Sequence, residues 1–263
     1  MHPSFGAVLI TGASSGIGRA LAVACAGPGA VLHLGGRDEA RLAAAAAACR
    51  ALGANVRAAV LDVRDAEATA AWIEGAGRLD LVVANAGISA GTGDGRPETA
   101  AQTRAVFGTN LEGMLNTALP AIAAMAGQPV GPDGVRGRIA VIASIAAFMA
   151  APGAPAYCAS KAAADAWTVG AAAMARRDGI VLTSVCPGYV RTAMTARNRF
   201  PMPGLMDADR AAAIILRGVA ANRRRVMFPW WMGLAARIVG GLPPRVSSAL
   251  LSMPEGKAPL AES

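Results

Sequence analysis

A glycine-rich turn near the start of the chain joins a short apolar strand, residues 7–10, to an alanine-rich helix, residues 19–26. The turn reads Thr11-Gly12-Ala13-Ser14-Ser15-Gly16-Ile17-Gly18. Glycine lets the main chain bend tightly and approach a ligand, while a helix start offers free N–H groups and a positive dipole end to phosphate. The turn lacks the Gly-Lys-Ser/Thr ending of a nucleoside triphosphatase loop, which disfavours ATP. This unit therefore predicts either a dinucleotide site or simply a tight connection.

The alternation of strands and helices continues along the chain with short connections. We expect further strands at residues 30–35, 56–61, 79–84, 138–143 and 180–186, and further helices at residues 38–51, 65–76, 98–126 and 157–177. This alternation predicts an α/β fold with a doubly wound parallel sheet, whose ligands bind at the carboxyl ends of the strands. A length of 263 residues fits one domain that covers residues 1–263.

The composition excludes several kinds of enzyme. Four cysteines show neither paired nor metal-like spacing, so we expect reduced thiols in a cytosolic protein. The chain has only two histidines, His2 and His33, which disfavours a Ser-His-Asp triad or a histidine-based metal site. We expect no metal. The first residues form no basic leader with a cleavage site, which predicts a cytoplasmic location. The uncharged run 139–160 predicts a buried strand and loop rather than a membrane span, because Pro152 and Pro155 interrupt it.

Tyr157 and Lys161 stand four residues apart in a predicted helix. Positions i and i+4 lie on the same helix face, so the phenol and the ammonium would share one small volume. A nearby cation favours the phenolate and brings the phenol pKa, ordinarily about 10, toward the working range. The pair can therefore exchange a proton with a substrate oxygen, or it can be a surface cation beside a half-buried ring.

Further motifs accompany this pair in a fixed order. They are Thr11-Gly12-x-x-x-Gly16-Ile17-Gly18, Asn85-Ala86-Gly87, Asn110, Ser144 and Pro187-Gly188. With these motifs the chain resembles the short-chain dehydrogenase/reductase family over residues 5–192. The resemblance implies a Rossmann-type fold, a nicotinamide cofactor, and hydride transfer between that cofactor and an alcohol or carbonyl carbon.

The same resemblance implies four catalytic residues. Tyr157 would be the general acid/base, and Ser144 would hydrogen-bond the substrate oxygen. Lys161 would lower the Tyr157 pKa and hold the nicotinamide ribose, while Asn110 would support a water that links Lys161 to solvent. A carbonyl that accepts hydride develops negative charge, which a hydroxyl donor and a phenol stabilise. The alternative is a cofactor-binding sensor with little turnover, which this complete set of side chains disfavours.

The resemblance also implies a cofactor-binding set. The glycines of the first turn would face the pyrophosphate, Asp62 and Val63 the adenine, and Thr192 the carboxamide region. Asn85 and Gly87 would face the adjoining ribose. The complete expected set is Thr11, Gly12, Ser14, Ser15, Gly16, Ile17, Gly18, Arg37, Asp62, Val63, Asn85, Ala86, Gly87, Tyr157, Lys161, Pro187, Gly188, Val190 and Thr192.

The residues after the second strand decide between NAD and NADP. The strand tip carries Gly35-Gly36 where an NAD enzyme carries an acid, and Asp38 suits the N-cap of the following helix. Arg37 can instead pair with a 2′-phosphate and stack on adenine. We therefore expect NADP as the cofactor, with NAD the less favoured alternative.

A substrate loop is expected at residues 193–208. It carries Met194, Phe200, Met202, Leu205 and Met206, and the apolar run 146–149 follows Ser144. These side chains predict an adaptable apolar pocket for a small carbonyl or alcohol, although a lid packed onto its own core would have the same composition.

The C-terminal extension, residues 223–263, lies outside the family resemblance. Arg223-Arg224-Arg225 precedes Trp230-Trp231 and an apolar helix, a combination that predicts peripheral binding to an anionic membrane. The alternative is a seventh strand and a terminal helix that pack over the active site or a dimer partner. We expect no nucleic-acid partner, since no recognised module appears. Small residues at 162–164 and 170–173 suggest a homodimer or homotetramer.

Overall fold

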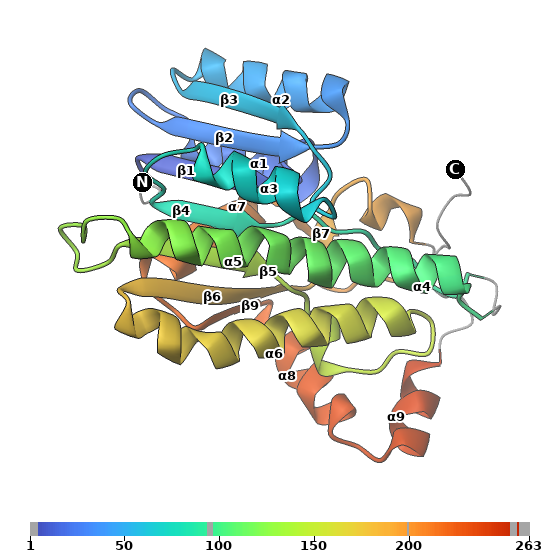
Figure 1. The fold of residues 1–263 in the computed structure, drawn as a ribbon. Coiled ribbons are helices and arrows are strands. Elements are labelled where there is room, and N and C mark those ends of the chain that lie inside the picture. Colours follow the sequence, from blue (N-terminus) through green and yellow to red (C-terminus); the bar gives the residue numbers. More distant parts are fainter. Residues whose placement is uncertain (1–4, 94–96, 199, 253–256, 258–263) are drawn as a thin grey trace.

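The computed structural model describes residues 5–93, 97–198, 200–252 and 257. Within this part of the chain, one sheet contains seven strands, all paired in parallel. In spatial order they are β3 (Asn55–Val60), β2 (Val31–Gly36), β1 (Ala7–Thr11), β4 (Leu81–Ala84), β5 (Gly137–Ile142), β6 (Ile180–Pro187) and β9 (Arg225–Phe228). The predicted doubly wound α/β fold is confirmed (Figure 1).

The central strands are buried on both faces. Every residue of β4, β5 and β6 is buried, which explains why these strands are largely apolar rather than alternating between apolar and polar residues. The order in which strands are added to the sheet reverses between β3 and β4: β2 and β3 lie on one side of β1, and the later strands lie on the other side. Ligands of such sheets bind at this switch point.

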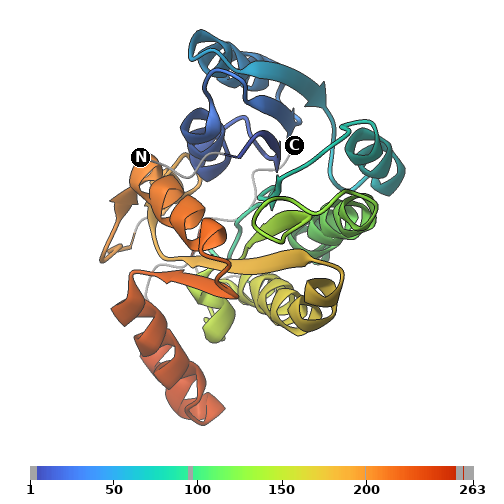
Figure 2. The same cartoon turned by 90° about the vertical axis from the view of Figure 1, so that its left-hand side faces the viewer.

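Helices cover both faces of the sheet (Figure 2). One layer contains α1 (Gly16–Cys25), α2 (Glu39–Ala51) and α7 (Ala208–Ala220), and the other contains α3 (Ala66–Glu74), α5 (Gly113–Ala126) and α6 (Pro155–Arg177). Each layer buries its own apolar cluster against the strands, for example Leu21 and Ile215 on the first face and Ile73 and Met125 on the second. The packing of these two clusters holds the strands in place, and with them the positions of their carboxyl ends.

The long helix predicted at residues 98–126 is interrupted. The structure has α4 (Ala100–Phe107), a π-helical turn (Gly108–Glu112) and α5 in succession. The extra residue of a π-turn rotates the side chains that follow, and such turns concentrate at functional sites. Asn110 lies inside this turn.

Two short elements frame the predicted substrate loop. β7 (Val190–Arg191) pairs with β8 (Met206–Asp207) in a separate small sheet, and a 3-10 turn (Thr195–Arg197) lies between them. The loop is therefore closed at its base by main-chain pairing.

The C-terminal extension contributes β9, α8 (Trp230–Gly240) and α9 (Pro244–Leu251). β9 forms the edge of the main sheet beside β6, whereas α8 and α9 project from the body of the molecule (Figures 1 and 2). The predicted seventh strand is confirmed, and two helices follow it where one was expected. In the residues that the structure describes, none of the helices combines the length and the apolar character that crossing a membrane requires.

Candidate active site

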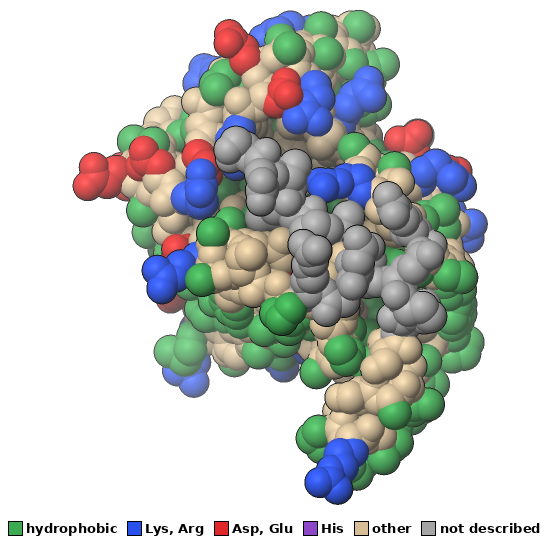
Figure 3. Space-filling view, turned by 90° about the vertical axis from the view of Figure 1, so that its right-hand side faces the viewer, with side chains coloured by type: hydrophobic (Ala, Val, Ile, Leu, Met, Phe, Trp, Pro, Cys, Tyr) green, Lys and Arg blue, Asp and Glu red, His purple; other side chains and the backbone are tan. Residues whose placement is uncertain are grey.

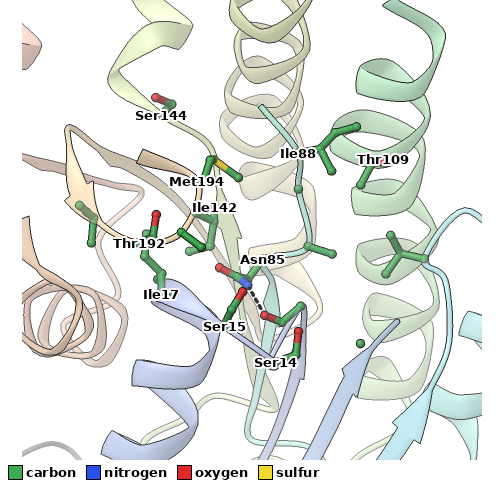
Figure 4. Close-up of a pocket in the computed structure, with 18 of the residues that line it drawn as sticks. Ser14, Ser15, Ile17, Asn85, Ile88, Thr109, Ile142, Ser144, Thr192 and Met194 are labelled. Atoms are coloured by element: carbon green, nitrogen blue, oxygen red, sulfur yellow. Dashed lines mark hydrogen bonds between the residues drawn. The ribbon is translucent and has the colours of Figure 1, made fainter. Parts of the chain in front are cut away.

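The glycine turn is held in place by Asn85, which follows β4. The Asn85 side-chain amide donates to the main-chain oxygens of Thr11 at 2.9 Å and Gly12 at 3.1 Å. A dashed line at Asn85 in Figure 4 marks a hydrogen bond of this side chain. The Thr11 hydroxyl accepts from the main-chain nitrogens of Asn85 and Ala86, at 3.0 and 3.2 Å. The Asn85 amide therefore holds the turn in place, and the expected contact of Asn85 with a ribose stays a prediction.

Glycine is required in this turn for two different reasons. Gly12 and Gly16 have φ of 66° and 54°, in the left-handed region that favours glycine. Gly18 instead allows close packing, because a Cβ there would collide with the Gly12 oxygen and lie 2.5 Å from Asn85 Nδ2. Gly18 does not itself line the cavity beside the turn, and its expected position facing the pyrophosphate stays a prediction.

A cavity of about 580 Å³ lies where the strands β1 to β6 end. It is open to solvent and gathers most of the expected residues (Figure 4). The expected cofactor and catalytic residues that line it are Gly12, Ser14, Ser15, Gly16, Ile17, Arg37, Asp62, Val63, Asn85, Ala86, Gly87, Ser144, Tyr157, Lys161, Pro187, Gly188, Val190 and Thr192. Thr11, Gly18 and Asn110 lie behind this wall and shape it.

Tyr157 is buried in the first turns of α6, and Ser144 follows β5. Burial raises the pKa of Tyr157 to about 12, and a hydrogen bond with Ser144 acts in the opposite direction. The Ser144 hydroxyl also accepts from the main-chain nitrogen of Ala146 at 3.1 Å, which holds it beside the cavity. The phenol is therefore protonated at neutral pH and suited to donate a proton.

Lys161 lies one helical turn beyond Tyr157, but its ammonium has a different partner. Lys161 Nζ donates to the main-chain oxygen of Ile142 at 2.7 Å. Burial lowers the pKa of Lys161 to about 8. The expected lowering of the Tyr157 pKa by Lys161 is not seen, because the loss of hydration of the phenol dominates and the ammonium is bound elsewhere.

Asn110 connects the π-turn to α6 and to the loop after β4. Its side-chain oxygen accepts from Ile88 N at 2.8 Å, and its amide donates to Ile88 O at 3.0 Å and to Ser160 Oγ at 3.1 Å. The Ser160 hydroxyl donates to the Tyr157 main-chain oxygen at 2.9 Å. Asn110 therefore couples the start of α6 to the cavity wall at Ile88.

Arginines gather in the cavity after β2. Asp38 caps α2 by accepting from Arg41 N at 2.9 Å, so its predicted role as an N-cap is confirmed. Arg37 Nη1 lies 3.7 Å from Asp62 Oδ2. The Arg37 side chain is exposed, so its guanidinium is accessible to a ligand. Arg41 also lines the cavity, which the sequence analysis did not predict. The donor set fits a 2′-phosphate, for which guanidinium forks are the usual partners.

Several lining residues were not predicted from the sequence. They are chiefly apolar or small, and are Gly36, Leu61, Ile88, Thr109, Ile142 and Ala143, whereas Ala193, Met194 and Thr195 belong to the predicted substrate loop. All of them are neighbours of predicted residues or lie at the ends of predicted strands. Proximity to a strand end was therefore the signal that could have found them.

The seven-stranded parallel sheet carries a glycine turn at its switch point, and one cavity there is lined by a tyrosine, a serine and a lysine. This combination defines a nicotinamide-dependent oxidoreductase of the Rossmann type. The family model for short chain dehydrogenases matches residues 6–201. The chain belongs to the short-chain dehydrogenase/reductase family and is an NAD(P)-dependent enzyme that acts on CH–OH or C=O groups.

Similar proteins support this membership. An uncharacterized oxidoreductase of Myxococcus xanthus is 35% identical over 244 residues, which cover 91% of this chain and 94% of that protein. Three other curated relatives are longer, and the chain spans about 33% of their length.

Solved structures agree with the fold. A short-chain dehydrogenase from Sphingobium yanoikuyae in complex with NADPH has a TM-score of 0.76 and 27% identity, over 91% of this chain and 97% of that one. A short chain dehydrogenase from Mycobacterium paratuberculosis bound to NAD has a TM-score of 0.73 and 22% identity, over 87% and 97%, and supports the fold alone.

Proposed function

We propose that the protein is an NADP(H)-dependent oxidoreductase that transfers hydride between the nicotinamide and an apolar alcohol or ketone, with Tyr157 as the acid/base. One observation carries this proposal: a single cavity is lined by Arg37 after β2 and by Ser144 after β5, with Tyr157 and Lys161 beside Ser144. Two strands separate β2 from β5 in the sheet, so the cavity spans the distance between a phosphate site and a proton donor.

Tyr157 and Ser144 would act on the substrate oxygen. A carbonyl that gains hydride develops negative charge on oxygen, and two hydroxyl donors aimed at that atom stabilise it. The Tyr157 phenol, protonated because its pKa is raised to about 12, gives its proton to this oxygen. This protonation state favours reduction, since oxidation would require the phenolate to accept the proton.

The remaining lining residues would hold the cofactor. Gly12 and Gly16 leave main-chain N–H groups at the start of α1 open to a pyrophosphate, and Asp62 and Val63 would contact the adenine. Lys161 would hold the nicotinamide ribose and Thr192 the carboxamide. When bound, the cofactor supplies or accepts the hydride.

Arg37 and Arg41 support NADP over NAD. The carboxylate of Asp38, the first acidic residue after β2, accepts from Arg41 Nε at 2.8 Å and from Arg41 N at the start of α2 at 2.9 Å. The NADPH complex of the Sphingobium relative is consistent with this preference.

The substrate would meet a largely apolar wall. Met194 lines the cavity, and Phe200 packs edge-on against Tyr189 at 6.0 Å between ring centroids. These contacts tie the 193–208 loop to the segment after β6. They also show that part of the loop packs on its own surroundings, as the alternative interpretation expected.

A homodimer or homotetramer is part of the proposal. Gly170 on α6 has open space around its Cα, and Met174 one turn further along is largely exposed. A smooth helix face of this kind accepts a second helix at close range.

Peripheral binding to an anionic membrane is a second candidate function of a cytoplasmic enzyme. Trp230, Leu234 and Ile238 form one stripe along α8 and are 71%, 51% and 60% exposed. The opposite face of α8 packs on the fold, since Gly233 and Ala236 are buried. Arg237 on α8 is exposed, as are Arg223 and Arg224, which precede β9, so basic groups are available on this helix and before the strand that leads to it. Figure 3 shows hydrophobic and basic side chains on the lower projecting part of the molecule.

The proposed chemistry is tested by titration with NADPH and NADH and by a carbonyl panel followed through loss of nicotinamide absorbance. Tight NADPH binding and turnover of apolar ketones are expected. Failure of any carbonyl or alcohol to react, despite NADPH binding, would favour the sensor alternative.

A further inference from the structure

Lys257, far along the chain from the sheet, reaches back to the face of the catalytic tyrosine. Its Nζ lies 3.4 Å from the centroid of the Tyr157 ring and donates to Ser89 Oγ at 2.9 Å. An ammonium over an aromatic face is attracted by the ring quadrupole. The sequence motifs predict an apolar substrate pocket and give no sign of a cation in it.

The loop after β4 is shaped to receive this lysine. Gly93 N donates to the main-chain oxygen of Lys257 at 2.8 Å. A Cβ on Gly91 would lie 2.6 Å from Lys257 Cβ, so any larger residue at Gly91 would displace it. Main-chain and side-chain contacts therefore both fix Lys257 beside Ser89, two residues after Gly87 of the cavity wall.

The Lys257 ammonium has no counter-ion among the residues that the structure describes. None of the ion pairs there involves it, and Glu98 accepts from Ala156 N through one carboxylate oxygen, at 3.1 Å, rather than from Lys257. Burial, together with the nearby Lys161, lowers the pKa of Lys257 to about 8, against a smaller opposing effect of Cys158. A partly buried ammonium without an anion is costly, and an anionic ligand group would remove that cost.

We propose that Lys257 is a specificity-determining residue that binds a carboxylate of the substrate, so that the enzyme acts on oxo acids or hydroxy acids with an apolar body. The inference deepens the proposed oxidoreductase function and rests on it. Lys257 contacts the ring of Tyr157, which does line the cavity, so a carboxylate bound to Lys257 would hold the substrate against the residue that handles the proton. The apolar residues around Met194 would receive the rest of the molecule.

Calorimetric titration of the NADPH-loaded protein with octanoate and with octanamide tests this proposal. The two probes have the same chain length and nearly the same shape, but only octanoate carries a charge. A charge-assisted hydrogen bond predicts octanoate binding at least about tenfold tighter than octanamide binding in the wild type. Lys257→Met should remove that difference by weakening octanoate alone, and Lys257→Arg should retain most of it.

NADPH affinity is the folding control, because Lys257 does not line the cofactor cavity. No octanoate binding to the wild type, or an unchanged octanoate affinity in Lys257→Met, would overturn the proposal. Tighter binding of both probes to Lys257→Met would also overturn the proposal, since the Lys257 side chain would then block the pocket rather than bind the carboxylate. A protein that prefers octanoate through Lys257 but reduces no carbonyl would instead count against the oxidoreductase proposal alone.

Discussion

The Lys161 ammonium donates a 2.7 Å hydrogen bond to the main-chain oxygen of Ile142, at the end of β5. The lysine is thereby tied to the strand that leads to Ser144, while its neighbour on the helix, Tyr157, keeps a raised pKa. The site joins a protonated phenol to a lysine whose pKa is lowered to about 8.

This arrangement predicts the pH dependence of carbonyl reduction. The Lys161 pKa is depressed, so the ammonium is present below about pH 8 and is lost as the pH rises through that value. Tyr157, with a pKa of about 12, stays protonated over the same range. We expect kcat/KM to fall about tenfold per pH unit above pH 8. A profile that stays level to about pH 10, the ordinary range of lysine, would contradict the assignment.

Arg37→Ala should weaken NADPH binding by about tenfold or more and change NADH binding little, because it removes a charge-assisted contact to the 2′-phosphate alone. Fluorescence titration with each cofactor measures both constants. Arg64→Ala is the matched control, since Arg64 also pairs with Asp62, at 2.7 Å, but does not line the cavity. Equal losses for the two cofactors in Arg37→Ala would count against NADP.

Arg225→Met should destabilise the protein by about 3 kcal/mol, because it leaves the buried Asp165 carboxylate without its ion partner. Arg225 makes two hydrogen bonds to Asp165, at 2.7 and 2.9 Å, and joins β9 to α6. Urea unfolding followed by tryptophan fluorescence measures the loss. Arg191→Ala, which breaks an exposed pair with Asp207, should cost less than about 1 kcal/mol. Similar losses in the two variants would show that burial of the pair is unimportant.

The α8 stripe predicts salt-sensitive but incomplete release from anionic vesicles. Replacing Trp230, Leu234 and Ile238 by alanine should weaken vesicle binding at least about tenfold, since the inserted apolar area is lost. Added salt should weaken wild-type binding without abolishing it, because only the arginine contribution is screened.

Co-sedimentation at two ionic strengths measures this binding. Alanine at Leu52 and Val60, which are exposed apolar residues elsewhere, is the control. Wild-type protein that stays in the supernatant with anionic lipid at low salt would rule out the membrane role.

Much of the fold could be predicted because local patterns and the global architecture agree. The strands β4 to β6 are largely apolar since both faces are covered, and Asp38 caps its helix from the position that the sequence predicts. Tyr157 and Lys161 were found because helix geometry fixes their spacing.

The remaining features depend on contacts between segments distant in the sequence. The π-turn at Asn110 breaks a helix whose composition shows no interruption, and it is held by Ile88 and Ser160. Lys257 meets Tyr157 only because the chain returns to the loop after β4. The pKa of Tyr157 depends on burial, which a spacing rule cannot weigh against a nearby cation.

Tyr157→Phe tests the central claim most directly, because it deletes one proton donor and preserves the ring. The measurement is the rate of NADPH oxidation with the best carbonyl of the panel, together with NADPH affinity. Tyr189→Phe is the control, since it makes the same change in the ring that packs on Phe200. We expect Tyr157→Phe to bind NADPH normally and to lose at least about a hundredfold in kcat, while Tyr189→Phe stays active. Activity of Tyr157→Phe within about threefold of the wild type would contradict the mechanism.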